Sequence, residues 1–524
     1  MKIATICVVS LAALPLSGVE PGSDPVVCCN EARTFLNGMR QTDQRMPKKN
    51  LFVDDAVIDR LQDVRRTLHQ PKKHGAVIRE DRPWEGTIQT RTGPSWNPEK
   101  KLWMLWYFAS GGTGYATSKD GIHWEKPVLG LREYKGSKEN NLVSETIWYP
   151  LYDPKDPDPN RRYKGVTPRL KVGASGGGFA PAVSPDGLNW KILENSFVLS
   201  QDEANLFHDA DRNQYVFTVK HPGPYGRSVY LTLSRDFEHW TDPRDCLIFH
   251  ADKRDQDLGR KWIEQRFSET TLQHPEYNIP SEYNVQVYNM ALFRYGDLYL
   301  GLPAMYHQTG RVSKDWEGFD KYDLVEEIRK AVRLYGDWTG FHHLQLISSR
   351  NLVDWQRVGG RQPFIDASPA NSGAYDLQTI MPAPPVVRGD EIWFYYTGIR
   401  NYAYVTSGRP DAGGICLAKL RLDGFVSLDA GDAGGTVLTK PIVVDGDNLR
   451  INLDASKGDV RAEILDAAGN RALPGYTMKE SVAARGDHVD AELRWRTARI
   501  SALKGRTVRL RFALRNASLY AFRF

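Results

Sequence analysis

Four acidic residues stand where strand-like segments begin, at widely spaced points of the chain: Glu85, Asp202, Glu282 and Asp376. A carboxylic acid can protonate a leaving oxygen while a second carboxylate acts as base or nucleophile. Two carboxyl groups confined in one funnel can hold opposite protonation states, because burial raises the pKa of one of them. We therefore treat these four residues as candidates for acid–base chemistry, provided that the fold brings them together.

Each of the four carboxylates also has a structural interpretation. Glu85 is the leading base or nucleophile, and the alternative is an exposed turn carboxylate paired with Arg82. If the segment that contains Asp202 is already a strand, alternation turns its neighbour Glu203 to the opposite face. Any of the four could instead be the salt-bridge partner that closes a repeat.

Aromatic and basic side chains near these carboxylates could bind a substrate. Trp84 stands beside Glu85 as an aromatic platform, and Trp148 could stack on a planar face of a ligand. The basic candidates would suit an acidic substrate, although each is equally compatible with an ordinary loop residue. The predicted binding residues are Arg82, Trp84, Trp148, His221, Tyr283, His307 and Arg400.

The elements that must position these residues are predicted by a short sequence pattern, here called the Trp phrase, that occurs four times. A strand-like run is followed by Ser, one residue, Asp or Asn, three residues and Trp, at 118–124, 184–190, 234–240 and 349–355. A strand, a polar turn and a Trp repeated in this way predict a radial β-repeat. We expect the Ser and Asp to cap the turn and the Trp to pack between repeats.

Counting the phrases predicts five repeats, or blades. Residues 423–425 (Asp-Gly-Phe) form a degenerate fifth phrase after the run 415–422. Two interruptions, 255–271 and 323–334, have apolar residues at helical spacing. The second accounts for the long interval before the fourth phrase. The predicted fold class is all-β, with a five-bladed β-propeller followed by a small C-terminal β-sandwich.

Length and composition divide the chain into four parts. With 524 residues it is too long for one compact core. Lys2 and the apolar run 3–16 predict a signal peptide over residues 1–23, with a polar lead-in over 24–79. The propeller is expected over 80–430. Beyond a Gly-rich stretch, alternating apolar and polar residues predict the sandwich over 436–524.

The phrase, the blade count and the trailing β-domain together resemble the five-bladed propeller glycosidases of families 43 and 32. The opening segments 51–55, 64–71 and 81–86 are similar to an exported subgroup near family 32. The resemblance implies carboxylates that converge from the innermost strands on one mouth of the axis. It also implies a reaction, the cleavage of a glycosidic bond by an acid and a base or nucleophile.

The sequence departs from family 32 in ways that limit the carry-over. It lacks the Asn-Asp-Pro-Asn-Gly, Arg-Asp-Pro and Glu-Cys phrases, which leaves the acid and base roles unassigned and removes fructan as a preferred substrate. The sialidase box spaces its residues differently and is the weaker match. His342 and His343 have no third ligand at a recognisable spacing, so we predict no cofactor and no metal. The resemblance to family 43 nevertheless allows one alternative, because some members of that family hold a calcium ion on the axis.

Charge and cysteine usage bear on the partners and the compartment. The net charge of +5 is small for this length and does not indicate a nucleic-acid partner. The excess of Lys and Arg after residue 436 allows an anionic glycan as a partner, or is simply a solvated face.

Cysteine usage bears on the compartment. Cys7 lies in the signal, which leaves Cys28, Cys29, Cys246 and Cys416. A disulfide to the start of the mature chain is one outcome in an oxidising compartment.

The sequence thus predicts a secreted or periplasmic glycoside hydrolase that acts on a poly- or oligosaccharide, without membrane insertion. A non-catalytic carbohydrate-binding propeller is the first alternative, because blades keep their shape when carboxylates are lost. A sialidase-like enzyme is the second alternative. A structural or protein-binding propeller would need no acidic mouth.

Overall fold

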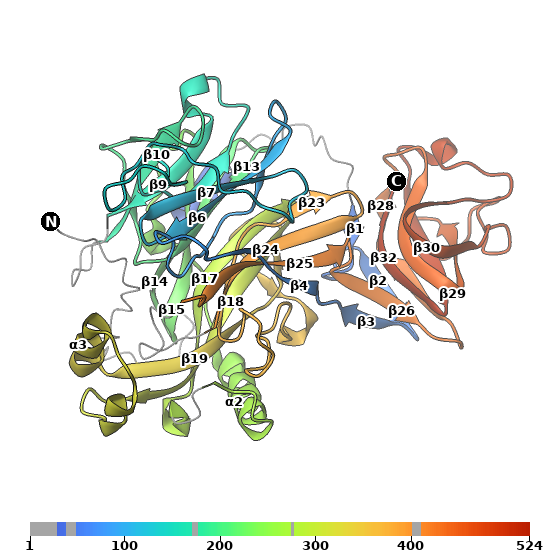
Figure 1. Cartoon of the computed structure of the whole chain (residues 1–524). Coiled ribbons are helices and arrows are strands. Elements are labelled where there is room, and N and C mark those ends of the chain that lie inside the picture. The colour runs from blue at the N-terminus through green and yellow to red at the C-terminus, as the bar shows by residue number, and fades with distance from the viewer. Residues whose placement is uncertain (1–28, 38–48, 170–176, 274–276, 401–409) are drawn as a thin grey trace.

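The computed structural model describes residues 29–37, 49–169, 177–273, 277–400 and 410–524. The predicted signal peptide and Cys28 lie outside the described residues. None of the described helices is both long enough and apolar enough to cross a membrane. Figure 1 shows a propeller next to a C-terminal sheet, with helices α2 (Lys253–Ser268) and α3 (Glu326–Tyr335) at one side of the propeller. Both helices fall where the sequence predicted them.

The first three blades are antiparallel sheets formed from consecutive strands, as the Trp phrases predicted. Blade 1 contains β5 (Ser95–Asn97), β6 (Leu102–Ala109) and β7 (Gly112–Ser118). Blade 2 contains β8 (Trp148–Tyr152), β9 (Tyr163–Pro168), β10 (Gly178–Ser184), β11 (Lys191–Ile192) and β12 (Val198–Leu199). Blade 3 contains β13 (Ala204–Asp209), β14 (Gln214–Gly223), β15 (Gly226–Ser234) and β16 (Leu247–Phe249).

The last two blades complete the predicted five. Blade 4 contains β17 (Asn284–Tyr295), β18 (Leu298–Val312), β19 (Asp337–Leu344), β20 (Ile347–Ser349) and β21 (Gln356–Arg357). Blade 5 contains β22 (Thr379–Pro382), β23 (Val386–Arg388), β24 (Glu391–Ile399) and β25 (Gly413–Arg421). Its outermost strand is β4 (Lys72–Arg79), which comes from the start of the chain and pairs antiparallel with β25. The ring is therefore closed by hydrogen bonds between two distant segments.

The C-terminal unit is a single curled antiparallel sheet of ten strands, half-barrel or sandwich-like. Two early strands extend it: β2 (Ile58–Gln62) pairs with β27 (Gly435–Thr439), and β3 (Arg65–Leu68) pairs with β26 (Val426–Ala430). Figure 1 shows these blue strands beside the orange and red ones. The other members are β1 (Asn50–Leu51), β28 (Ile442–Val443), β29 (Leu449–Leu465), β30 (Ala484–Leu493), β31 (Thr507–Arg515) and β32 (Ala517–Arg523). One buried apolar core runs from this sheet into blades 4 and 5.

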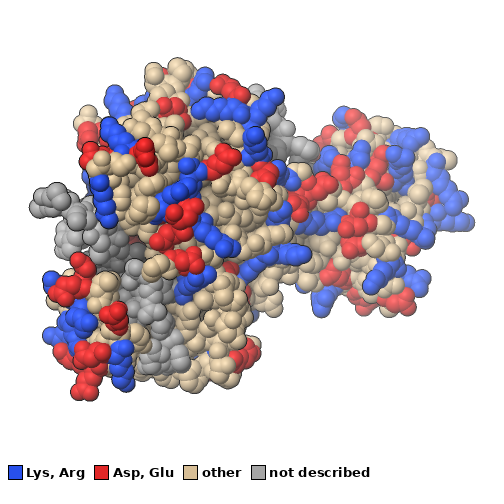
Figure 2. Space-filling model, viewed as in Figure 1, with Lys and Arg blue, Asp and Glu red and all other residues tan. Residues whose placement is uncertain are grey.

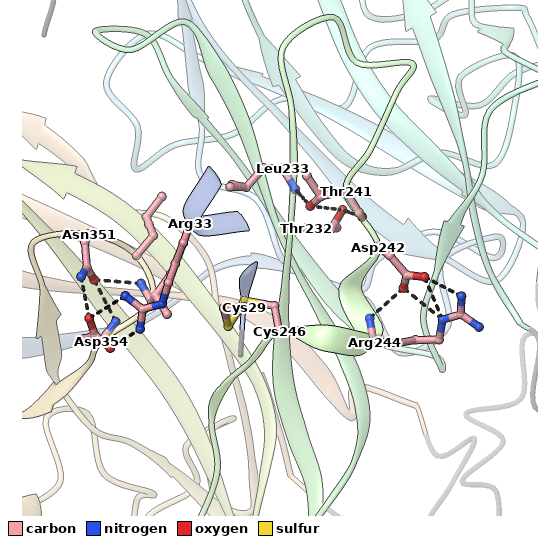
Figure 3. Close-up of a disulfide and its surroundings, with 12 residues drawn as sticks. Cys29, Arg33, Thr232, Leu233, Thr241, Asp242, Arg244, Cys246, Asn351 and Asp354 are labelled. Carbon is pink, nitrogen blue, oxygen red and sulfur yellow. Dashed lines mark hydrogen bonds and ion pairs between the residues drawn. A yellow bond between two sulfur atoms is a disulfide. The ribbon is translucent and has the colours of Figure 1, made fainter. Parts of the chain in front are cut away.

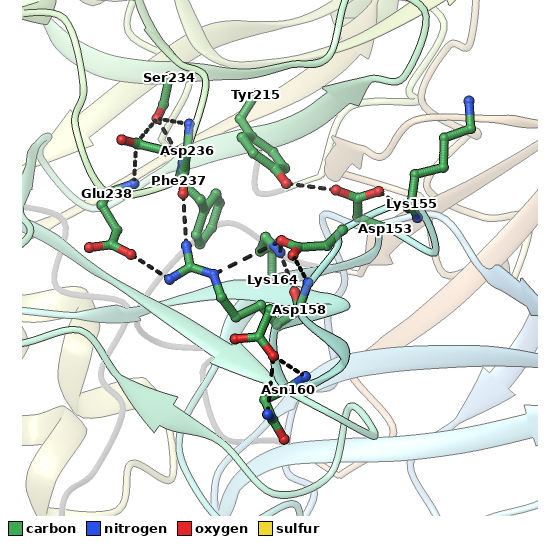
Figure 4. Close-up of polar contacts among 12 residues, drawn as sticks. Asp153, Lys155, Asp158, Asn160, Lys164, Tyr215, Ser234, Asp236, Phe237 and Glu238 are labelled. Carbon is green, nitrogen blue, oxygen red and sulfur yellow. Dashed lines mark hydrogen bonds and ion pairs between the residues drawn. The ribbon is translucent and has the colours of Figure 1, made fainter.

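The Trp phrases form turns with a common geometry, which confirms their predicted capping role. In blade 2, Asp186 Oδ1 accepts hydrogen bonds of 2.8 Å from the backbone N–H groups of Leu188 and Asn189. Trp190 Nε1 donates to the carbonyl of Gly187 at 3.0 Å. The residue after the Asp has positive φ, which glycine adopts without a steric cost, as Gly187 does at 77°. Figure 4 shows the corresponding turn of blade 3 against residues from blade 2.

A disulfide joins the start of the described chain to blade 3, which is the pairing the sequence left open. Cys29 bonds to Cys246, just before β16. The following helix α1 (Asn30–Asn37) places Arg33 Nη2 at 2.8 Å from Asp354 Oδ1, in the phrase of blade 4. Figure 3 shows both attachments. Helix α1 therefore bridges blades 3 and 4, while Cys416 is buried and free.

We expect removal of this disulfide to destabilise the protein substantially. The bond constrains a loop of 217 residues in the unfolded chain, and such cross-links typically contribute about 2–4 kcal/mol. Equilibrium unfolding in urea of the double variant Cys29→Ala, Cys246→Ala measures the loss. Arg33→Met is the matched control, because it removes only an exposed ion pair of α1 and should cost less than about 1 kcal/mol. Equal stability of the double variant and the native protein would contradict the prediction.

The turn of blade 3 should make the protein sensitive to acid. Burial works against ionisation of Asp236, but the backbone N–H and ring of His239 and the N–H of Glu238 lower its pKa to about 2. Because this pKa lies below the value in the unfolded chain, the stabilisation is complete above about pH 4 and is lost as the pH falls towards 2.

The variant Asp236→Asn tests this acid sensitivity. Blade 4 has Asn351 at the equivalent position, where its side-chain oxygen accepts from Asp354 N at 2.8 Å, so an amide preserves the turn. We expect the free energy of unfolding to fall less steeply between about pH 4 and pH 2 in Asp236→Asn than in the native protein. Asp315→Asn, at an exposed position, should keep the native slope. Parallel slopes for all three proteins would rule the explanation out.

Candidate functional site at the propeller axis

Inner segments of three blades meet at the axis through one amide. Asn205, on β13, donates from Nδ2 to the carbonyl oxygens of Arg91 in blade 1 and Pro382 in blade 5, both at 3.1 Å. Around this point lie charged and aromatic side chains that we call the axial cluster. Its members are Arg91, Tyr149, Asp202, Glu203, Lys220, Arg227 and Tyr288.

A buried ion pair joins blade 1 to blade 3 within the axial cluster. The Arg91 guanidinium meets the Glu203 carboxylate through two parallel contacts, Nε to Oε2 at 2.8 Å and Nη2 to Oε1 at 2.5 Å. The Arg91 side chain is only 1% exposed. Such a bidentate pair fixes both groups in space.

A second pair contains the one predicted carboxylate that lies in the axial cluster. The Asp202 carboxylate contacts Lys220 Nζ, and Asp202 is 25% exposed whereas Lys220 is 2% exposed. Burial lowers the pKa of Lys220, and the nearby Asp202 opposes that shift. Lys220 Nζ also lies 4.1 Å from the centroid of the Tyr288 ring, with the Arg227 guanidinium 5.4 Å from the same ring. Asp202 is thus the partly exposed partner of a buried lysine.

Two aromatic residues of blade 2 support the cluster from one side. Tyr149 accepts a hydrogen bond of 3.0 Å from the Ala204 N–H through its hydroxyl oxygen. Burial and the charge of Glu203 raise the pKa of Tyr149 well above its usual range. Trp148 stacks on Phe108 of blade 1 at 4.7 Å between ring centroids and is largely buried. Trp148 is therefore packed between blades, not presented as an open platform.

Glu85 is found inside the protein, away from any open surface. Oε2 accepts from the backbone N–H groups of Asp81 and Arg82 at 2.8 and 3.0 Å, and Oε1 contacts Tyr107 and Lys126 at 2.6 Å each. The side chain is 0% exposed. A carboxylate enclosed in this way holds a turn together. The structural alternative, an exposed carboxylate paired with the Arg82 side chain, is therefore not what the structure shows.

The neighbours of Glu85 are part of the same turn. Arg82 is exposed, and its guanidinium lies 3.5 Å from Asp81. Trp84 donates from Nε1 to Asn141 Oδ1 at 2.7 Å and packs against the core of blades 1 and 5. Neither residue belongs to the axial cluster.

Glu282 and Tyr283 lie beside helix α2. Glu282 ends an exposed 3₁₀ turn, Pro280–Glu282. Tyr283 donates to Asn278 Oδ1 at 2.6 Å, and the Arg260 guanidinium of α2 lies 5.2 Å from its ring centroid. Tyr283 therefore holds α2 against the chain just before β17.

The two predicted histidines are packed against aromatic rings. His221 meets Tyr230 edge-on at 5.2 Å between ring centroids. His307 is fully buried beneath α2, where its ring stacks on Phe341 at 4.8 Å and contacts Trp262 at 5.6 Å. Burial lowers the pKa of His307 to about 3, so its ring is neutral. Its contacts are those of a core residue.

Asp376 and Arg400 lie together, on blade 5. The Asp376 carboxylate accepts from Ser368 Oγ at 2.7 Å and Tyr396 Oη at 2.9 Å, and Lys73 Nζ lies 2.8 Å away. The Arg400 guanidinium lies 4.1 Å from the centroid of the Tyr375 ring. Both residues line a cavity of about 370 Å³ that includes no member of the axial cluster. The four predicted carboxylates thus occupy four separate environments.

Sequence reasoning missed Arg91 and Lys220, and it turned Glu203 to the opposite face only if 202–203 were strand. Because β13 begins at Ala204, that condition is not met, and both carboxylates turn to the cluster. Lys220 did leave a signal, because it lies in a strand whose other central residues are buried and apolar. A lysine there needs an anionic partner. The described residues contain no group of three or more His, Cys, Asp or Glu side chains that could hold a metal ion.

The chain is similar in structure to five-bladed propeller glycoside hydrolases related to families 32 and 43, at low identity. A glycoside hydrolase has 14% identity and a TM-score of 0.40, covering 67% of this chain and 92% of that chain. A GH32 β-fructofuranosidase of Bombyx mori has 10% identity and a TM-score of 0.38, covering 96% and 99%. A glycosyl hydrolase from Bacteroides ovatus has 13% identity and a TM-score of 0.35, covering 73% and 97%.

These likenesses concern the fold alone. The five blades that the Trp phrases predicted are confirmed by the sheets of this chain. No family model matches the sequence, and no curated protein matches it. The candidate site therefore depends on the geometry of the axial cluster.

The Arg91–Glu203 pair should be essential for stability. In Glu203→Gln the buried guanidinium loses its counter-charge, and breaking one half of a buried pair costs about 3–5 kcal/mol. Urea unfolding of Glu203→Gln measures this loss. Glu282→Gln makes the same chemical change at an exposed position and should leave the free energy of unfolding unchanged. A Glu203→Gln variant as stable as Glu282→Gln would show that the pair contributes little.

Proposed function

We propose that the protein is an exported glycoside hydrolase that cleaves glycosidic bonds of a poly- or oligosaccharide at the axial mouth. The observation that carries the proposal is the position of Asp202. Its carboxylate is the one predicted catalytic group that lies in the axial cluster, and it is partly exposed there. The fold is that of propeller glycoside hydrolases, in which such a mouth is the expected place for the reaction.

The environment of Asp202 suits a base or nucleophile. The Asp202 carboxylate is paired with Lys220, and the burial of Lys220 places the pair beside a low-dielectric region where their attraction is strong. Glu203 does not suit the acid role, because both of its carboxylate oxygens are engaged by the Arg91 guanidinium. In this proposal Asp202 attacks the anomeric carbon or takes a proton from an attacking water. The glycosidic C–O bond then breaks, and the leaving oxygen takes its proton from solvent water. Glu203 holds Arg91 in place.

Export has separate support. The Cys29–Cys246 disulfide is of a kind that persists in oxidising compartments and is rare in the cytosol. The positively charged start and the apolar run 3–16 have the pattern of a signal peptide. A secreted or periplasmic location fits both observations and a polymeric substrate outside the cell.

One observation favours a second candidate, a carbohydrate-binding propeller without catalysis. Both carboxylates of the axial cluster are neutralised by buried cations. Among the described residues, the axial cluster therefore has no carboxyl group without a cationic partner to serve as the general acid of hydrolysis. A mouth built in this way could bind a sugar and leave it intact.

We expect Asp202→Asn to reduce glycan hydrolysis by at least about a hundredfold, because the charged base or nucleophile is removed. Reducing-sugar release from a panel of neutral, uronic and sulfated glycans measures the activity of the native protein and the variant. Asp315→Asn, remote and exposed, is the matched control and should retain native turnover. Hydrolysis that survives in Asp202→Asn would overturn its role. Binding without any cleavage by the native protein would favour the carbohydrate-binding candidate.

A further inference from the structure

Blade 5 contains a cavity that the axial cluster does not reach. Its volume of about 370 Å³ lies within the range of small-ligand sites. It lies against the outer strands of the blade, β24, β25 and β4, and beneath the segment 368–376. Its lining residues include Lys73, Arg79, Ser368, Tyr375, Asp376 and Arg400.

A tyrosine between two guanidinium groups marks one side of this cavity. The Tyr375 ring centroid lies 4.1 Å from the Arg400 guanidinium and 5.5 Å from that of Arg79. The Tyr375 hydroxyl donates to Asp411, and Arg400 Nη1 contacts the same carboxylate at 2.9 Å. Asp411 therefore serves as the counter-ion of Arg400 and fixes the position of the aromatic ring.

The other acidic residue of the cavity is also matched by a cation. Asp376 is almost fully buried, and its carboxylate is paired with Lys73 Nζ at 2.8 Å. Lys73 Nζ is further held by Ser368 Oγ at 3.0 Å and by the Asp366 carbonyl oxygen. The cavity thus has a built polar floor, in which each donor and acceptor is held in place by neighbours.

Arg79 is the third cation that lines the cavity, beside Lys73 and Arg400. It is the last residue of β4 and is exposed, and among the described residues its guanidinium has no ion pair or hydrogen bond. Three cations and two carboxylates line the cavity, and each carboxylate already has a cation. One positive charge with five N–H donors is therefore left facing a space of small-ligand size.

We propose that this cavity is a second binding site, for a sugar residue that bears a carboxylate or sulfate group. Arg79 binds the anionic group, as guanidinium groups do in a bidentate manner. Asp376 and Ser368 on the floor are placed to meet sugar hydroxyls, because carboxylate oxygens can accept more hydrogen bonds than Asp376 now receives. The sugar part of this assignment rests on the proposed function, whereas the anionic part does not.

Calorimetric titration of the full chain with D-galacturonate tests the proposal, with D-galactose as the neutral probe. We expect galacturonate to bind more tightly than galactose. In Arg79→Ala the affinity for galacturonate should fall about tenfold or more, because a charge-assisted hydrogen bond is lost. Lys72→Ala is the matched control, since it removes an exposed cation from the other end of the same strand and should leave the affinity unchanged.

Equal affinity for the two sugars, no binding of galacturonate, or equal losses in Arg79→Ala and Lys72→Ala would each overturn the assignment. Inorganic sulfate is the third probe, and binding of sulfate as tight as that of galacturonate would reduce the cavity to an anion site. The same titration on Asp202→Asn separates this proposal from the hydrolytic one. Galacturonate binding should persist there, whereas its loss would place the ligand at the axial mouth.

Discussion

The architecture depends on a contact that recurs where each blade meets the next. A side chain of one blade bonds to the polar turn of the following blade, at the Trp phrase or its degenerate fifth form. These turns have inward-facing carbonyl and carboxylate oxygens that need donors once they are buried. The donors are Trp106 to Gly187, Arg161 to Asp236, Tyr295 to Asp423 and Tyr395 to Gly121. Between blades 3 and 4 the contact is weaker, an exposed ion pair from Arg33 of α1 to Asp354 of the phrase, and the disulfide attaches α1 to blade 3.

The segment 50–79 joins the ring to the C-terminal sheet through its strand pairings. Blade 5 is completed by β4, and the strands that precede β4 belong to the C-terminal sheet. The segment 50–79 therefore links ring closure to the formation of the sheet. Side chains of both signs are interspersed over the visible face of both parts, as Figure 2 shows. The shared apolar core provides the cohesion.

The sequence allowed prediction of the elements that repeat, and little of what depends on long-range pairing. The phrases predicted the number of blades, the turn geometry and the helices between them, because each depends on neighbouring residues. The strands of 50–79 pair with blade 5 and with the C-terminal sheet, but no local sequence pattern indicates these pairings. Strand β4, for example, contains two lysines, a histidine and a glycine. Side-chain direction was equally hidden. Glu85 begins its blade as expected but turns towards Tyr107 and Lys126, where burial and two donors stabilise it.

In the axial cluster, the charged side chains that join the blades are also those that surround the candidate site. The Arg91–Glu203 pair joins the inner segments of blades 1 and 3, so its members cannot move to follow a reaction without loosening the ring. Lys220 is enclosed to the same degree, whereas Asp202 and Arg227 are partly exposed. In the proposed reaction a sugar at the axis would therefore meet Asp202 with a buried ammonium group beside it. The rigidity that closes the propeller is also what would hold this carboxylate in a fixed direction for the proposed chemistry.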